Sequence, residues 1–96
     1  MKLVLSFQGV QIQEYALDRP VLSIGRRDEN DIVIDHMGVS GTHAQIAMEG
    51  QSVILTDLKS TNGTFVNGQR VERVELRPND WISIGKHIVT LKAGPR

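Results

Sequence analysis

The stretch that best indicates the fold is Ser60-Thr61-Asn62-Gly63-Thr64-Phe65-Val66-Asn67-Gly68. Its second half places Asn67-Gly68 between short apolar segments, and Asn-Gly tolerates the positive φ angles of the type I′ turn that joins two antiparallel strands. We therefore interpret Asn67 as a hairpin residue rather than a ligand contact. The first half contains no carboxylate, histidine or cysteine, so it suits neither acid–base catalysis nor metal binding. Its hydroxyls, amide and flexible backbone are groups that hold an anion or a peptide main chain. Taken alone, the four residues Ser60-Thr61-Asn62-Gly63 are equally well explained as an ordinary turn.

Outward from this hairpin, the chain shows the two-residue periodicity of β-strands, interrupted by turn residues. We expect strands at residues 2–7, 10–15, 20–24, 32–34, 44–48, 52–56, 65–66, 69–71, 81–85 and 87–91. No window carries the apolar face of a helix for more than a couple of turns. Many short strands separated by turns predict an all-β sandwich or barrel.

The length and composition are those of one soluble globular domain. The 96 residues are 40% hydrophobic and 23% charged, which is ordinary for such proteins. We expect the domain to span residues 1–92, with residues 93–96 as a tail or the start of a linker. The N-terminal apolar segment is too short for a signal peptide, and no stretch is long and apolar enough to span a membrane.

The charge balance and the absence of cysteine exclude several functions. Lysine plus arginine and aspartate plus glutamate number 11 each, for a formal net charge of zero, which argues against a general nucleic-acid binder. Without cysteine the chain has no disulfide, no thiolate nucleophile and no cysteine-based zinc site, and it suits a reducing cytoplasm. We expect no cofactor.

Two more polar clusters lie at strand ends, Gly25-Arg26 and Ser40-x-x-His43, where they could converge on one rim with Ser60–Gly63. Taken alone, Arg26 reads most simply as a solvated arginine. A serine three residues before a histidine could suggest a hydrolase, but no acid is placed to orient the imidazole and no G-x-S-x-G elbow exists. We favour His43 as a structural residue whose ring nitrogens tie its loop down and support Ser40.

A metal site is the next alternative. The spacing of Asp31, Asp35, His36 and His43 matches no established set of ligands. The two aspartates are more simply solvated charges that flank a short strand. His36 and His87 are interpreted as lone histidines, ordinary surface or strand residues.

The order of these clusters along the chain resembles the forkhead-associated (FHA) domain. The pattern is Gly25-Arg26, then Ser40-x-x-His43, then Thr61-Asn62-Gly63-Thr64-Phe65-x-Asn67-Gly68. Each dipeptide is a weak signal, but the ordered set is highly specific and the resemblance extends over nearly the whole chain. It implies a β-sandwich of about eleven strands whose loops at one end bind phosphothreonine peptides, with phosphoserine bound more weakly.

The resemblance also implies which residues contact the phosphopeptide. Arg26 would contact the phosphate or the adjacent peptide backbone, and Ser40 would donate its hydroxyl to the phosphate. Gly41 would contribute its main-chain N–H, although family members often carry a polar or basic side chain at this position. Thr61 would lie beside the phosphothreonine, and Asn62 would hydrogen-bond the peptide main chain just after it.

Three further residues would support the site rather than touch the ligand, namely Gly25, His43 and Asn67. Gly38 stands where some members carry a charged side chain that selects the peptide, so the peptide preference is not predicted. The implied function is phosphothreonine-dependent peptide binding in Ser/Thr kinase signalling, without enzymatic activity. Its partners would be a phosphothreonine protein and an upstream kinase, not nucleic acid or membrane. The alternative is a phospho-independent interaction module that uses the same loops.

Overall fold

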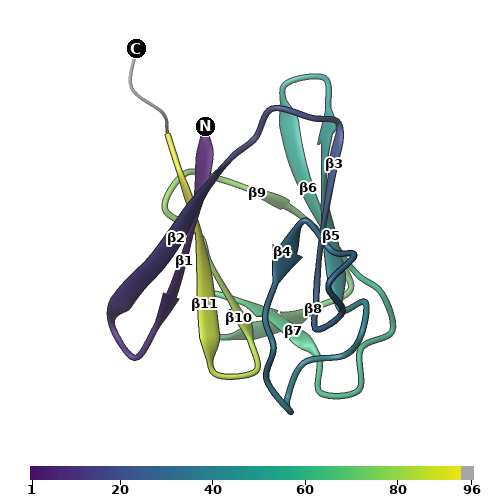
Figure 1. Cartoon of the computed structure of the whole chain (residues 1–96). Coiled ribbons are helices and arrows are strands. Elements are labelled where there is room, and N and C mark those ends of the chain that lie inside the picture. Colours follow the sequence, from purple (N-terminus) through teal and green to yellow (C-terminus); the bar gives the residue numbers. More distant parts are fainter. Residues whose placement is uncertain (94–96) are drawn as a thin grey trace.

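The computed structural model describes residues 1–93 and folds them into two packed β-sheets (Figure 1). The expected all-β sandwich is confirmed. The strands are β1 (Lys2–Phe7), β2 (Val10–Ala16), β3 (Val21–Gly25), β4 (Ile32–Val33), β5 (Ala44–Glu49), β6 (Ser52–Asp57), β7 (Thr64–Val66), β8 (Gln69–Val71), β9 (Arg73–Leu76), β10 (Trp81–Ile84) and β11 (His87–Lys92). One sheet has the order β2-β1-β11-β10-β7-β8 and the other β4-β3-β5-β6-β9. All pairs are antiparallel except β3 with β4.

The core lies between the sheets and follows from the alternation of apolar residues. Successive side chains of a strand point to opposite faces, so every second residue can be buried against the facing sheet. The buried residues alternate in this way along most strands: Leu3, Leu5, Leu22, Ile24, Ala44, Ile46, Val53, Leu55, Ile82, Ile84, Val89 and Leu91. This apolar layer holds both sheets in one rigid scaffold for the loops.

Strand β9 is absent from the sequence-based expectation. Val74 and Leu76 pack on the core while Arg73 and Glu75 are exposed, so the alternation is present but short. The strand was missed because β8 ends at Val71 and only Glu72 separates it from β9. At this residue the chain crosses from one sheet to the other, a change that local periodicity does not reveal.

The strand expected at residues 32–34 is β4, which covers Ile32–Val33. Just before it, Asp31 is held by hydrogen bonds of its side chain. Its Oδ2 accepts hydrogen bonds from the Ser23 N–H at 2.9 Å and from the Ser23 hydroxyl at 3.3 Å. Arg19 also donates to this carboxylate at 2.8 Å. The interpretation of Asp31 as a merely solvated charge is therefore wrong. These hydrogen bonds, the Ser23 N–H first among them, hold the pKa of Asp31 below its usual value.

The β4–β5 and β6–β7 loops project from the end of the sandwich opposite the N-terminus and the end of β11 (Figure 1). Residues 1–93 contain no helix that is long and apolar enough to cross a membrane. Of the expected tail at residues 93–96, all but Ala93 lies outside the described residues. The domain boundary at residue 92 therefore stays a prediction.

Candidate functional site

The end of β3 is joined to the β4–β5 loop by main-chain hydrogen bonds. The Arg26 N–H donates to the Ser40 carbonyl at 2.9 Å, and the Arg27 N–H donates to the Gly41 carbonyl at 3.2 Å. Gly25 precedes these contacts, and a Cβ on it would lie 2.3 Å from the Gly41 carbonyl oxygen. Only glycine permits this approach, so the first two polar clusters of the sequence meet in space.

His43 joins the β4–β5 loop to the β6–β7 loop on their buried side. Its ring is fully buried. Nδ1 accepts a hydrogen bond from the Ser40 N–H at 3.1 Å, and Nε2 lies 2.9 Å from the Gly63 carbonyl oxygen. Because Nδ1 accepts, the hydrogen is assigned to Nε2, which donates to Gly63. Both ring nitrogens are used by main-chain groups, and neither faces the Ser40 hydroxyl.

The β3–β4, β4–β5 and β6–β7 loops together form one edge of the sandwich, which we call the rim, and Ser40 lies on its middle loop. Its Oγ accepts a hydrogen bond from the Thr61 N–H at 3.1 Å. A hydroxyl that accepts through its oxygen still has its own hydrogen to donate. The Ser40 hydroxyl is therefore oriented by the β6–β7 loop and keeps a donor for a ligand.

Asn62 closes the rim on the other side of Ser40. Its Nδ2 donates to the Gly38 carbonyl at 3.0 Å, which ties the β6–β7 loop to the β4–β5 loop. The residue is exposed, and this bond uses only one of the two amide hydrogens. The second N–H and the side-chain carbonyl can still reach an extended peptide main chain.

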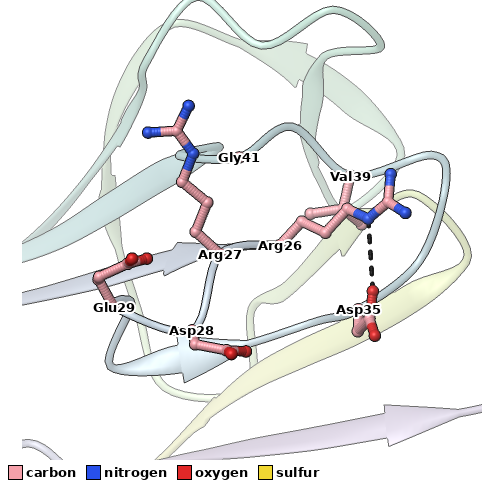
Figure 2. A pocket seen from close by; sticks show the side chains of 7 residues that line it. All are labelled: Arg26, Arg27, Asp28, Glu29, Asp35, Val39 and Gly41. Carbon is pink, nitrogen blue, oxygen red and sulfur yellow. Dashed lines mark hydrogen bonds and ion pairs between the residues drawn. The ribbon is translucent and has the colours of Figure 1, made fainter.

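Arg26 extends from the end of β3 over a surface depression of about 590 Å³ (Figure 2). The depression is lined by Arg26, Arg27, Asp28, Glu29, Asp35, Val39 and Gly41. The Arg26 Nε lies 3.3 Å from Asp35 Oδ1, in an ion pair whose side chains are 50% and 82% exposed. Such an exposed pair is weak, so the guanidinium can exchange Asp35 for a stronger anion.

Asp57 orders the β6–β7 loop from inside, a role that the sequence analysis missed. It accepts hydrogen bonds from the Ser60 N–H, the Ser60 hydroxyl and the Thr64 hydroxyl, the last at 2.7 Å. The Ser60 Oγ in turn accepts from the Gly63 N–H at 3.0 Å. An aspartate three residues before a serine, ahead of Asn-Gly, is the signal that could have indicated this turn.

The protonation of Asp57 is coupled to these bonds. Burial by itself raises the pKa of its carboxyl, but hydrogen bonds from Ser60 and Thr64 and the nearby His43 ring outweigh it. The pKa therefore lies below the usual 3.8. The carboxylate is charged at neutral pH, and it anchors the segment that presents Thr61 and Asn62.

Asn67 lies in the β7–β8 turn with φ at 51°, followed by Gly68 at 86°. These are the positive angles of the expected turn. The Asn67 Nδ2 donates to Asp80 at 2.9 Å, and its Oδ1 accepts from the Trp81 N–H at 3.0 Å. These contacts tie the hairpin to β10, and no hydrogen bond among the described residues joins the Asn67 side chain to the rim.

His87 is a strand residue of β11, as expected, but His36 and His87 are not lone histidines. The Phe7 and His87 rings stack with centroids 4.5 Å apart, and the His36 ring meets His87 edge-on at 5.6 Å. Burial, with a smaller effect of His36, lowers the pKa of His87 below its usual 6.5. Within the described part of the chain no group of three or more histidine, aspartate or glutamate side chains is placed to hold a metal ion.

Two curated relatives are bacterial proteins named as a regulator and as an inhibitor. The chain is 37% identical over 82 residues to the glycogen accumulation regulator GarA of Mycolicibacterium smegmatis, covering 85% of this chain and 52% of GarA. It is also 37% identical over 82 residues to the oxoglutarate dehydrogenase inhibitor of Corynebacterium diphtheriae, covering 85% and 57%. The chain thus spans about half the length of these relatives.

Two solved structures share the fold over nearly the whole chain. One, from a structural and functional analysis of phosphothreonine-dependent FHA domain interactions, has a TM-score of 0.87 and 30% identity and covers 100% of both chains. The other is Mycobacterium tuberculosis EmbR in complex with a low-affinity phosphopeptide, with a TM-score of 0.86, 34% identity and coverage of 99% of this chain and 26% of EmbR. A family model described as FHA domain matches residues 22–85. The chain therefore belongs to the FHA-domain family.

Proposed function

We propose that this domain binds phosphothreonine-containing peptides through the rim formed by Arg26, Ser40, Gly41, Thr61 and Asn62. The observation that carries the proposal is the Ser40 hydroxyl, whose oxygen accepts the Thr61 N–H and whose hydrogen is left to donate. The Arg26 main-chain N–H donates to the Ser40 carbonyl, and Arg26 and Gly41 both line the adjoining depression. A Ser/Thr protein kinase adds the phosphate to the threonine, so binding reports the action of that kinase.

The chemistry of a phosphate suits this set of groups. A phosphothreonine carries nearly two negative charges and three acceptor oxygens. Arg26 offers a charged fork, and Ser40 and Gly41 offer single donors. Three charge-assisted hydrogen bonds of about 1.5–3 kcal/mol each, less the cost of ordering an extended peptide, correspond to roughly micromolar affinity. Such an interaction reverses when the phosphate is removed.

The names of the relatives support a regulatory binding role. GarA is named as a regulator and the corynebacterial relative as an inhibitor. We propose in addition that the domain is not an enzyme, since His43 directs both ring nitrogens to main-chain groups and leaves none to activate Ser40. We also propose a cytoplasmic location, consistent with a chain that lacks cysteine. We further propose that the partners are a phosphothreonine-containing protein and the upstream Ser/Thr kinase.

A second candidate is binding of an unphosphorylated partner at the same rim. It is favoured by the ion pair between Arg26 and Asp35, which already satisfies part of the guanidinium. Because both side chains are exposed, the Arg26–Asp35 ion pair is weaker than a contact between Arg26 and a dianionic phosphate would be. The first proposal therefore accounts better for the free donors of the rim.

Fluorescence anisotropy with matched phosphorylated and unphosphorylated peptides tests the proposal. We expect saturable binding of the phosphothreonine form and none of the other. Arg26→Ala and Ser40→Ala should each remove most of the binding while the melting temperature hardly changes, because both side chains lie at the rim. Equal affinity for both peptides would establish the phospho-independent candidate instead.

A further inference from the structure

The open face of Gly41 is occupied by a side chain from another loop. A Cβ on Gly41 would lie 2.8 Å from the Nε of Arg27 and 3.3 Å from its Cδ and Cγ. The Arg27 side chain therefore fills the space that a side chain at position 41 would take. Gly41 follows Ser40 directly, so this space adjoins the proposed phosphate position.

The backbone of Arg27 is held firmly in this place. Its N–H donates to the Gly41 carbonyl at 3.2 Å, and its own carbonyl accepts from the Asn30 N–H at 3.1 Å and the Asn30 Nδ2 at 2.9 Å. The same Nδ2 lies 2.8 Å from the Gly41 carbonyl oxygen. Asn30 thus joins the β3–β4 turn to Gly41 and sets where the Arg27 side chain begins.

The guanidinium of Arg27 is available, in contrast to that of Arg26. The residue is exposed, and within residues 1–93 its side chain makes no ion pair or hydrogen bond. Figure 2 shows it running up beside Gly41, whereas Arg26 turns toward Asp35 and Asp28 lies on the opposite side. Asp28 and Glu29 line the same depression without forming an ion pair with either arginine.

We infer that Arg27 is a second phosphate-binding arginine, which supplies from the β3–β4 loop the side-chain contact that Gly41 lacks. This inference rests on the proposed function and deepens it. Arg26 shares its charge with Asp35, while Arg27 brings an uncompensated charge and a planar fork of donors. The glycine at position 41 is then the residue that admits Arg27 to the site.

Fluorescence anisotropy tests this role with a labelled pool of peptides that are degenerate around a fixed phosphothreonine, alongside the unphosphorylated pool. We expect Arg27→Ala to weaken binding of the phosphorylated pool about tenfold, the loss of one charge-assisted contact. The matched control is Arg77→Ala, which removes the same charge from the β9–β10 loop, where Asn79 contacts the C-terminal end of β11. It should bind like wild type, and both variants should keep the wild-type melting temperature.

A rescue experiment distinguishes a phosphate contact from a structural effect. Gly41 has a φ outside the left-handed region, so a side chain there meets Arg27 but no backbone strain. Gly41→Arg should therefore restore binding in the Arg27→Ala background and add little to wild type, where the two side chains compete for one space.

Each remaining outcome decides the matter. If wild type binds both pools equally, the proposed function fails and the inference fails with it. If wild type requires the phosphate but Arg27→Ala binds as tightly, only the role of Arg27 is overturned. A loss of equal size in Arg77→Ala, or no rescue by Gly41→Arg, would also overturn it, because the effect would then be one of net charge or of local folding.

Discussion

At the scale of single residues, the rim separates side chains that hold the loops from side chains that are free to bind. His43 is fully buried, and both of its ring nitrogens form hydrogen bonds with main-chain groups. Arg26 is exposed and Ser40 is half-buried at the rim, and the Ser40 hydroxyl keeps a hydrogen to donate. A buried polar group that loses its partner costs stability, whereas an exposed one costs little. Substitution of a buried residue should therefore lower the stability of the fold, whereas substitution of an exposed one should change ligand binding and leave stability nearly unaltered.

For the buried class we predict that His43→Ala lowers the free energy of unfolding by about 1–3 kcal/mol, since the Ser40 N–H and the Gly63 carbonyl lose their partner. Urea denaturation followed by tryptophan fluorescence measures it. Thr42→Ala, at the exposed neighbouring residue, is the control and should stay within about 0.5 kcal/mol of wild type. A His43→Ala protein as stable as wild type would contradict a structural role for the ring.

For the exposed class we predict that Asp35→Asn tightens phosphopeptide binding by about two- to fivefold. The change frees Arg26 from an exposed ion pair of small energy and removes a negative charge near the phosphate. Titration calorimetry with one phosphothreonine peptide measures it. Asp28→Asn removes a charge from the same depression without freeing Arg26. An equal gain in that variant would show that the loss of a nearby negative charge, and not the release of Arg26, causes the tighter binding.

At the scale of elements, the β6–β7 loop is ordered by one carboxylate at the end of β6. Asp57 holds Ser60 and Thr64 through three hydrogen bonds, and the loop between them presents Thr61 and Asn62. Because the pKa of Asp57 is depressed in the folded protein, the unfolded chain binds more protons in the acid range. By linkage, its contribution to stability is complete above the unfolded pKa and is lost as pH falls through the folded pKa.

We therefore predict that wild type is more stable than Asp57→Asn at pH 6, and that the difference shrinks as pH falls below about 4. Thermal unfolding of the two proteins from pH 6 to pH 3 measures it. Taking the difference between them cancels the titration of the other carboxylates. A difference that stays constant over this range would mean that the charge of Asp57 does not hold the loop.

At the scale of the whole molecule, one core supports a rim built from three separated loops. Leu55 is fully buried on β6, and its register partners are Ile46 on β5 and Val74 on β9. The formal net charge is zero, so net charge gives no general attraction for an anionic ligand, and the proposed affinity would rest on contacts at the rim. Stability and binding therefore draw on different parts of the molecule.

We predict that Leu55→Ala lowers the free energy of unfolding by about 2–5 kcal/mol, the usual range for a buried leucine. The phosphopeptide affinity of the fraction that remains folded should be unchanged. Chemical denaturation and anisotropy at low temperature measure the two quantities on one sample. A loss of affinity in fully folded Leu55→Ala protein would show that the core also tunes the rim.

The sequence alone determined the strands, the turns and the order of the polar clusters. Alternating apolar residues and Asn67-Gly68 act over a few neighbours, so local pattern predicted the all-β class and most strand positions. Strand β9 was missed because the chain changes sheets at Glu72, and only pairing with β6 makes residues 73–76 a strand. Asp31 was misread because its partner Ser23 lies on β3, outside the short run of residues that local pattern covers.

Only the tertiary structure brought the polar clusters together. Ser40 and Thr61 are 21 residues apart in the chain, yet they share a hydrogen bond at the rim. That contact depends on the strand order β4-β3-β5-β6, which places three loops side by side. The same order joins Arg26 to Asp35 and lays Arg27 over Gly41. Strand pairing over long sequence separations decides which side chains meet, and no local pattern contains that information.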